Sequence, residues 1–185
     1  TSNPVDGRRK SGSVGLPLQG ISIRISNPIN EIGELEIKGP NLCMGYWQKE
    51  EATKQSLTVD GFFKTGDQAR EDTDGYITIV GRKTDLVITG GLNVYPVEVE
   101  KVINDIKGVL ECTIVGISDD DFGEAVTAII VRKDDSKLNE NKIIELAKQK
   151  LASYKVPKAV FFVSTLPRNT MGKIQKDIIK QQFIK

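Results

Sequence analysis

The chain has 185 residues, of which 38% are hydrophobic and 28% are charged, and this composition is typical of one or two globular domains. It contains no histidine, which excludes a Ser-His-Asp or Cys-His mechanism and any histidine metal site from this stretch. No apolar run approaches the roughly 18 residues of a membrane span, and the first residues lack the apolar core of a signal peptide, so we expect no membrane partner.

The net charge of +1 hides an uneven distribution. Residues 148–185 hold nine Lys or Arg and a single acid, Asp177, so the remainder of the chain is acidic. A basic tail favours a polyanionic ligand, either a nucleic acid or the phosphates of a small molecule, and the alternative is a solvated helix face. Because the tail has few aromatic side chains to stack on bases, we expect no nucleic-acid partner.

The two cysteines, Cys43 and Cys112, lie far apart in the sequence. They are interpreted as free thiols in a reducing compartment, which predicts a cytoplasmic protein. The sequence starts without Met and reads like the middle of a protein, so we expect a fragment of a longer chain.

The first half of the chain is rich in strand patterns. Residues 21–26 ("ISIRIS") and 34–39 ("ELEIKG") alternate apolar and polar residues, which predicts two strands joined by a turn. Residues 44–57 predict a loop that leads into a short helix. Residues 63–69 ("FKTGDQA") are interpreted as a loop with a glycine turn, and residues 72–89 as a hairpin whose first turn holds Asp74 and Gly75.

The second half alternates helices and strands. A helix that begins near Pro96, a helix capped by Asn139 and a final helix that begins at Lys173 all show apolar residues at helical spacing. Three strands are predicted between these helices, at 109–117, 124–133 and 159–166. This order indicates an α+β sandwich of about 100 residues, and we place the domain boundary near Thr84, between residues 1–83 and 84–185.

Three short stretches are candidates for chemistry, although each is a weak signal alone. Asp67 follows a glycine and is a turn residue or an acceptor for two hydroxyl groups, such as those of a ribose. Gly90 and Gly91 permit a positive φ or a close approach of the backbone to a ligand. Lys173 carries a compact ammonium suited to phosphate or carboxylate oxygens, and it follows Gly172.

Together and in this order, these stretches resemble a known family. "GELEIKGPNLCMGYW", "FKTGD", "GRKTDLVITGGLNVYPVEVE" and "PRNTMGK" are similar to four successive motifs of the adenylate-forming superfamily, which contains acyl-CoA synthetases, adenylation domains and luciferases. The resemblance covers nearly the whole chain. Within the superfamily, "ITGGLNVYPVEVE", "DDDFGEAVTAIIVRK" and "LPRNTMGKIQK" look most like bacterial malonyl-CoA synthetases.

The resemblance implies a two-step reaction. ATP and a carboxylate form an acyl-adenylate and pyrophosphate, and CoA then attacks the adenylate to give a thioester and AMP. It also implies that residues 1–83 are the β-rich end of a large N-terminal domain and that residues 84–185 are a complete, mobile C-terminal domain. The acid would be malonate or methylmalonate, and Mg²⁺ is expected with ATP, with its ligands outside this stretch.

The resemblance assigns a role to individual residues. Asp67 and Arg82 match the residues that hold the ribose of ATP. Thr84 falls on the hinge, where relatives often carry Asp or Lys, so this chain departs from the pattern there. Gly90 and Gly91 match the loop that lines the pantetheine tunnel. Lys173 matches the lysine that reaches the α-phosphate and the substrate carboxylate, and a lysine acetyltransferase and deacetylase are implied as partners acting on it.

Two other functions remain open at this point. The chain could belong to an adenylation domain that loads a carrier protein, or it could be a non-catalytic interaction module. The phosphate-binding loop and most of the acyl pocket of the family are absent from these residues, so we expect the 185 residues alone to be inactive as a ligase.

Overall fold

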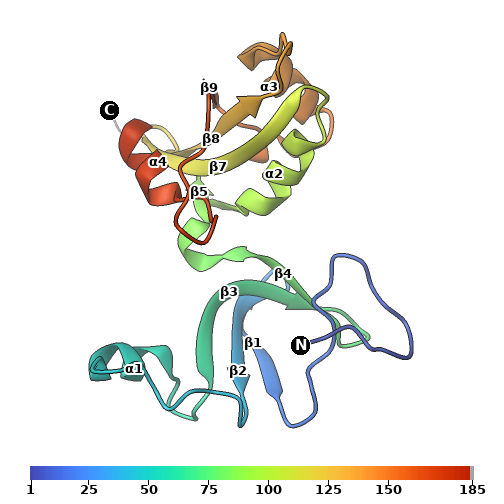
Figure 1. Ribbon diagram of the computed structural model, residues 1–185, viewed down its shortest axis with the longest axis vertical. Coiled ribbons are helices and arrows are strands. Elements are labelled where there is room, and N and C mark those ends of the chain that lie inside the picture. Colours follow the sequence, from blue (N-terminus) through green and yellow to red (C-terminus); the bar gives the residue numbers. More distant parts are fainter. Residues whose placement is uncertain (184–185) are drawn as a thin grey trace. The chain divides into compact units, whose positions relative to one another are not determined.

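The computed structural model describes residues 1–183 and divides the chain into two compact units (Figure 1). The first unit is Thr1–Thr84 and the second begins at Asp85, one residue beyond the boundary expected from the sequence. Lys185, the last residue of the basic tail, and the end of the predicted final helix at Ile184 lie outside the described residues.

The first unit is an antiparallel sheet with the strand order β1-β2-β3-β4. Its core consists of Leu35, Ala69 and Ile77, against which the apolar residues of β1 and β2 pack. This arrangement follows from the alternating pattern, because every second side chain of a strand points to the same face. The elements are β1 (Ser22–Ile29), β2 (Ile32–Lys38), α1 (Glu50–Ser56), β3 (Phe63–Glu71) and β4 (Ile77–Arg82).

Two interpretations of the first half were wrong. The segment around Asp67 is not a loop, because it forms the middle of β3 and pairs with β4. The predicted hairpin over residues 72–89 is also incorrect beyond its first turn. Gly75 does lie in the turn between β3 and β4, but Val87–Thr89 forms β5 of the other sheet. Within β3, Gly66 adopts a positive φ of 74°, which bends the strand. This bend is why the sequence around Asp67 resembled a turn.

The second unit is a mixed sheet with helices on both faces, which confirms the predicted α+β class. The strand order is β6-β5-β8-β7, and β9 runs parallel to β8. The strands are β5 (Val87–Thr89), β6 (Leu92–Val94), β7 (Val109–Asp119), β8 (Gly123–Arg132) and β9 (Ala159–Val163). The helices are η1 (Lys83–Asp85, at the boundary), α2 (Pro96–Asn104), α3 (Glu140–Lys148), η2 (Ser153–Lys155) and α4 (Lys176–Phe183).

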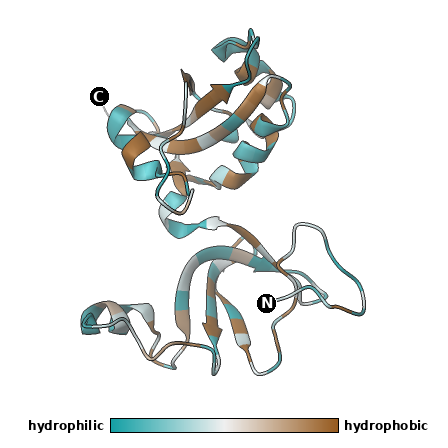
Figure 2. Ribbon diagram, in the orientation of Figure 1, coloured by the Kyte–Doolittle hydropathy of each residue, from teal (hydrophilic) through white to brown (hydrophobic). Residues whose placement is uncertain are grey.

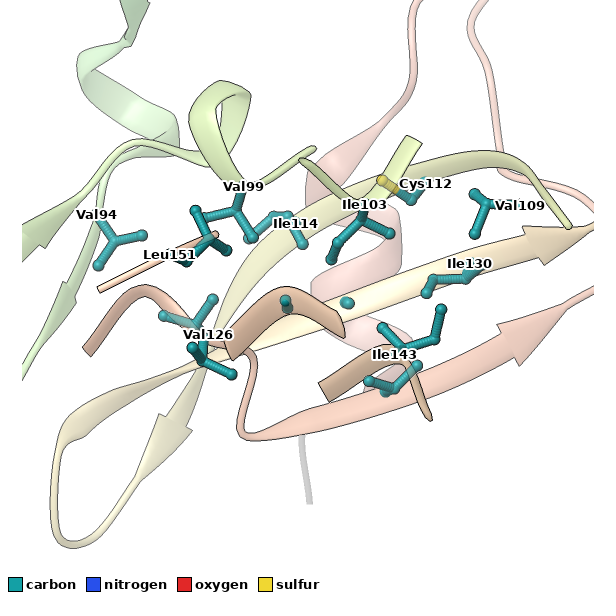
Figure 3. Packing of buried hydrophobic residues seen from close by; sticks show 14 of the residues in the cluster. Val94, Val99, Ile103, Val109, Cys112, Ile114, Val126, Ile130, Ile143 and Leu151 are labelled. Carbon is teal, nitrogen blue, oxygen red and sulfur yellow. The ribbon is translucent and has the colours of Figure 1, made fainter. Parts of the chain in front are cut away.

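Alternate residues of β8 face two different cores. Val126, Ala128 and Ile130 pack against α2 and α3, and Figure 3 shows this cluster. Ile129 and Val131 belong to the second cluster, which contains Ile179 of α4. Figure 2 shows that the apolar residues of this unit are concentrated on β7 and β8. A strand buried on both faces reads as a continuous apolar run, as "AVTAIIV" does.

Two of the three predicted helix starts agree with the structure. Pro96 occupies the first turn of α2, and the Asn139 side chain caps α3 by accepting a hydrogen bond from the Lys142 amide at 2.9 Å, both as predicted. The final helix begins at Lys176 and not at Lys173, because residues 169–173 form a turn of their own. Among residues 1–183, no helix is long and apolar enough to cross a membrane.

Candidate functional site

Asp67 and Arg82 face each other across the β3–β4 ladder. The Arg82 Nε lies 3.0 Å from Asp67 Oδ1, and the Arg82 side chain is about half exposed whereas that of Asp67 is only 20% exposed. Arg82 also donates to the Thr65 carbonyl at 2.9 Å. A carboxylate held in this way on a strand is a fixed acceptor for hydroxyl groups, which is the chemistry expected of a ribose contact.

The bend at Gly66 is fixed by its neighbour Thr65. The Thr65 hydroxyl accepts from the Asp67 amide at 3.1 Å and donates to the Leu35 carbonyl on β2 at 2.7 Å. Because these bonds join three consecutive residues to the adjacent strand, the direction of the Asp67 backbone is set by the sheet. Sequence analysis did not single out Thr65, although a Thr before a Gly-Asp pair is a signal that could have found it.

The boundary between the two units is the single turn η1, which holds Thr84, the predicted hinge residue. The ion pair of Lys83 with Glu34, 2.9 Å from Nζ to Oε2, ties the start of this turn to β2 in the first unit. Asp85, at its end, contacts Lys176 in the second unit, with 3.7 Å between Nζ and Oδ2. Each end of the turn therefore has an ion pair with a residue of its own unit.

Gly90 and Gly91 form the two-residue turn between β5 and β6. Both have positive φ, 55° and 77°, which is what a tight hairpin turn with the right-handed twist of its strands requires. The Gly90 amide donates to the Phe122 carbonyl at 2.8 Å. Within the described chain, a Cβ placed on Gly91 would meet nothing within 4 Å. The backbone angles therefore favour glycine at both positions, and the space beside Gly91 is open.

A pocket of about 310 Å³ adjoins this turn within the second unit. It combines apolar, aromatic and cationic side chains from three segments of the chain, namely Thr89, Gly90, Leu92, Phe122, Ser153, Tyr154 and Lys158. The Lys158 ammonium lies 4.3 Å from the centre of the Phe122 ring. Thr89 is 3% exposed, and its hydroxyl is the one buried side-chain polar atom without a hydrogen-bond partner among the described residues.

Phe122, Tyr154 and Lys158 were not singled out in the sequence, because they come from separate segments that only the fold brings together. Phe122 follows an acidic run, and Tyr154 and Lys158 lie after a helix, so no local motif links them to Gly90. The one available signal was the basic tail, which contains Lys158.

Lys173 lies at the end of a turn that the Asn169 side chain holds together. Asn169 Oδ1 accepts from the amides of Met171 and Lys173 at 3.0 and 2.9 Å. The Asn169 amide in turn donates to the Lys173 carbonyl at 2.9 Å. Gly172 has a φ of 78°, a conformation that glycine adopts without strain. The turn is thus fixed by hydrogen bonds rather than loosened by its glycine.

The Arg168 guanidinium braces the same turn from outside. It donates to the Gly172 carbonyl at 2.7 Å and pairs with the Glu111 carboxylate on β7. The Lys173 side chain itself is exposed, and its ammonium has no ion-pair partner among residues 1–183. The turn therefore presents a single cation whose charge no neighbouring carboxylate neutralises.

Three other cations of the basic tail are less available than its net charge suggests. Lys155 pairs with Glu98 at 2.7 Å and Lys176 with Glu100 at 2.8 Å, both on α2, and Arg168 pairs with Glu111. The favourable field for phosphates expected from the tail is consequently concentrated at fewer positions, of which Lys173 is one.

The chain matches a known protein family and several solved structures. Residues 98–173 match the AMP-binding enzyme C-terminal domain, and that match includes the Lys173 turn. The structure resembles that of ATP-bound MatB from Rhodopseudomonas palustris, with a TM-score of 0.92 and 45% identity over 99% of this chain and 38% of the other. The chain belongs to the adenylate-forming, AMP-binding enzymes.

The relatives differ in the acid that their names give. A malonate–CoA ligase from Arabidopsis thaliana is 42% identical over 98% of this chain and 32% of its own length. A 2-succinylbenzoate–CoA ligase from Bacillus cytotoxicus is 39% identical over 93% of this chain and 36% of its own. The chain spans about a third of the length of the relatives that it matches.

Mg²⁺ was expected with ATP, with its ligands outside this stretch, and it stays a prediction. Among residues 1–183, no group of three His, Cys, Asp or Glu side chains could hold a metal ion. Asp67 and Arg82 supply a fixed acceptor and a donor side by side, which is chemistry that suits hydroxyl groups.

Proposed function

We propose that this chain forms part of an AMP-forming acid–CoA ligase and that its acid is malonate. The observation that carries the proposal is the Lys173 turn, whose hydrogen bonds fix the backbone of a residue with an exposed ammonium within a domain of the adenylate-forming family. The similarity to the malonate–CoA ligase supports malonate, and the nearly equal similarity to the 2-succinylbenzoate–CoA ligase makes the acid the part to be tested first.

In the first half-reaction, a carboxylate oxygen of the acid attacks the α-phosphorus of ATP and pyrophosphate leaves. Two anions repel each other as they approach, and the Lys173 ammonium offsets this repulsion most strongly as charge builds in the transition state. Asp67 accepts hydrogen bonds from the ribose hydroxyls, and Arg82 holds that carboxylate in place. The residues of this chain thereby orient the nucleotide and stabilise the charge on the reacting groups.

In the second half-reaction, the CoA sulfur attacks the acyl carbon, its proton is lost to the medium, and AMP leaves. The Gly90–Gly91 turn leaves room for the pantetheine arm, since neither residue has a side chain. The adjoining pocket offers an aromatic ring, an ammonium and the unpartnered Thr89 hydroxyl. These groups suit the apolar, amide and phosphate portions of the same thiol. We propose that the second unit is the mobile domain and that Thr84 is its hinge.

Pyrophosphate exchange in the full-length protein tests the proposal. Malonate, methylmalonate, 2-succinylbenzoate and a long-chain fatty acid are each offered with ATP, and exchange is expected with malonate first. Thioester formation is then measured with CoA and with a phosphopantetheinylated carrier protein. Exchange with none of the acids would overturn the ligase assignment, and transfer to the carrier protein alone would favour a carrier-loading enzyme.

A further inference from the structure

Lys176, the first residue of α4, has an ammonium that contacts two carboxylates at once. Its Nζ lies 2.8 Å from Glu100 Oε1 on α2 and 3.7 Å from Asp85 Oδ2 in the boundary turn. The side chains of Lys176 and Glu100 are only 17% and 19% exposed. An ion pair this sheltered from water is screened less than an exposed pair, so losing one partner lowers the stability of the fold more.

Glu100 is itself fixed to the sheet. Its Oε1 also accepts from the Thr113 hydroxyl at 3.1 Å and from the Ile114 amide at 3.0 Å, both on β7. Three donors therefore converge on one carboxylate oxygen. The end of the Lys176 side chain is consequently placed relative to both α2 and β7, and not merely held near a mobile surface acid.

Backbone hydrogen bonds fix the short segment that connects the Lys173 turn to Lys176. The Gln175 amide donates to the Pro167 carbonyl at 2.9 Å, and Arg168 and Ile174 form a β-bridge. Residues 167–176 are thus a closed loop with two ionic anchors, one at Arg168 and one at Lys176. Lys173 lies between these anchors, and neither of them contacts its ammonium in the described chain.

The second contact of Lys176 points to the boundary between the units. Asp85 is the last residue of η1 and directly follows the predicted hinge residue Thr84. One ammonium therefore links the loop that carries Lys173 to the residue next to the hinge. A change in the backbone of residues 83–85 would alter this contact directly.

We propose that Lys176 is a positioning residue that couples the placement of Lys173 to the conformation of the boundary turn. This inference rests on the proposed function, because Lys173 is the group that acts on the substrate. Lys176 touches neither substrate nor cofactor in this role. It supports adenylate formation, and it has no part in the attack of CoA.

The test compares Lys176→Met with Lys155→Met in the full-length protein. Lys155 is a matched control, because it is 19% exposed and pairs with another carboxylate of α2, Glu98, at 2.7 Å. Lys176→Met is expected to lower the kcat of adenylate formation by about tenfold to a hundredfold, since small displacements of a catalytic group have effects of this order. The KM for ATP and the thioester step from supplied acyl-adenylate should change much less, and Lys155→Met should leave adenylate formation unchanged.

Two further variants separate positioning from stability. Lys176→Arg keeps the cation and should restore most of the adenylation rate. Asp85→Asn weakens the contact with Lys176 beside the hinge and should give a partial loss. Thermal unfolding is measured for every variant. Lys176→Met is expected to lower the midpoint more than Lys155→Met, because Glu100 is more sheltered than Glu98, and both midpoints should stay well above the assay temperature while the adenylation rates differ. Equal effects of the two variants on adenylation would overturn the inference.

Hydrogen exchange distinguishes failure of this inference from failure of the proposed function. If the wild-type protein shows no pyrophosphate exchange with any acid, the proposed function fails, but the amides of Met171 and Lys173 still report on the turn. These amides should exchange faster in Lys176→Met than in Lys155→Met. Equal exchange in both variants would show that Lys176 does not position the turn.

Discussion

The two glycine-containing turns of the second unit are built in opposite ways. The Gly90–Gly91 turn has positive φ at both residues, open space beside Gly91 and one backbone hydrogen bond to Phe122. The turn at residues 169–173 has one such glycine and is held by the side chains of Asn169 and Arg168. The feature of the first turn is the open space beside Gly91. The feature of the second turn is the set of hydrogen bonds that fix the backbone of Lys173.

This difference predicts which substitutions damage each turn. Added volume should impair the Gly90–Gly91 turn, where no side chain exists to be lost. Loss of a charge or of a polar contact should impair the Lys173 turn, where the space around Gly172 is open as well. Under the proposed function the two turns should also separate by half-reaction, because we assign the first to the approach of CoA and the second to adenylate formation.

The largest effect is expected for Lys173→Ala in the full-length protein. Removing one positioned charge of this kind typically lowers the rate on the order of a hundredfold or more, and the loss should appear in pyrophosphate exchange. The thioester step from a supplied acyl-adenylate should remain largely intact. Lys173→Arg should fail as well, because a planar guanidinium does not replace a compact ammonium at a crowded phosphate.

Two controls accompany this variant. Thermal unfolding should be nearly unchanged, since the Lys173 side chain is exposed and unpaired among residues 1–183. Acetyl-lysine placed at position 173 removes the same charge and should reproduce the alanine result. Unchanged rates of both half-reactions in Lys173→Ala would mean that Lys173 only completes the turn.

Gly91→Trp should block thioester formation and spare adenylate formation. The indole would fill the space beside Gly91, and displacing the reacting thiol by about 1 Å can lower a rate on the order of a hundredfold. Gly91→Ala is the matched control, because any Cβ at a φ of 77° brings strain of about 1–2 kcal/mol without the bulk of the indole. Equal loss of both half-reactions in Gly91→Trp would contradict the assignment of this turn to the CoA path.

A smaller effect is expected for Asn169→Ala, which removes the acceptor of two turn amides. Each lost hydrogen bond should lower the unfolding free energy by about 1 kcal/mol or less at this exposed position, and the adenylation rate should fall by roughly tenfold as Lys173 loses its placement. Asn169→Asp keeps an acceptor oxygen and should recover part of the rate. Adenylation at the wild-type rate in Asn169→Ala would show that Arg168 alone suffices to hold the turn.

The sequence predicted what depends on local patterns. The strands β7 and β8 follow from long apolar runs, and the cap at Asn139 and the start at Pro96 follow from residues with a single strong preference. The order of these elements was enough to indicate the α+β class. The position of β3 was missed, because the Gly66 bend breaks an otherwise alternating strand and resembles a turn.

The site was predictable as motifs but not as geometry. The order of the motifs singled out Asp67, Arg82 and Lys173, yet it could not reveal that the first two are paired across a ladder or that Asn169 fixes the turn. The pocket that Thr89 and Lys158 both line could not be predicted, because it forms only when separate segments fold together. The catalytic roles of all these residues remain predictions, as do those of Thr84, Gly90 and Gly91.

The smallest expected effect concerns the reactivity of the Cys112 thiol, which contacts Glu100, the residue that pairs with Lys176. Its Sγ donates to the Glu100 carbonyl at 3.5 Å, and burial raises the pKa of the thiol to about 12, with a further contribution from the Glu100 charge. Cys43 is exposed and provides an internal reference for reagent activity.

In the native protein at pH 8, iodoacetamide should modify Cys43 and leave Cys112 intact. Alkylation requires the thiolate, and a pKa near 12 instead of the ordinary 9.0 lowers its population about a thousandfold, in addition to the steric protection of the core. Because the folded state holds this proton more tightly than the unfolded state, the contribution of Cys112 to stability should fall as the pH rises from about 9 to about 12. Mass spectrometry should find one label in the native protein, two in urea and none in native Cys43→Ser. Rapid labelling of Cys112 in the native protein would mean that α2 separates from β7, and the anchors of the Lys173 turn would then be weaker than these contacts indicate.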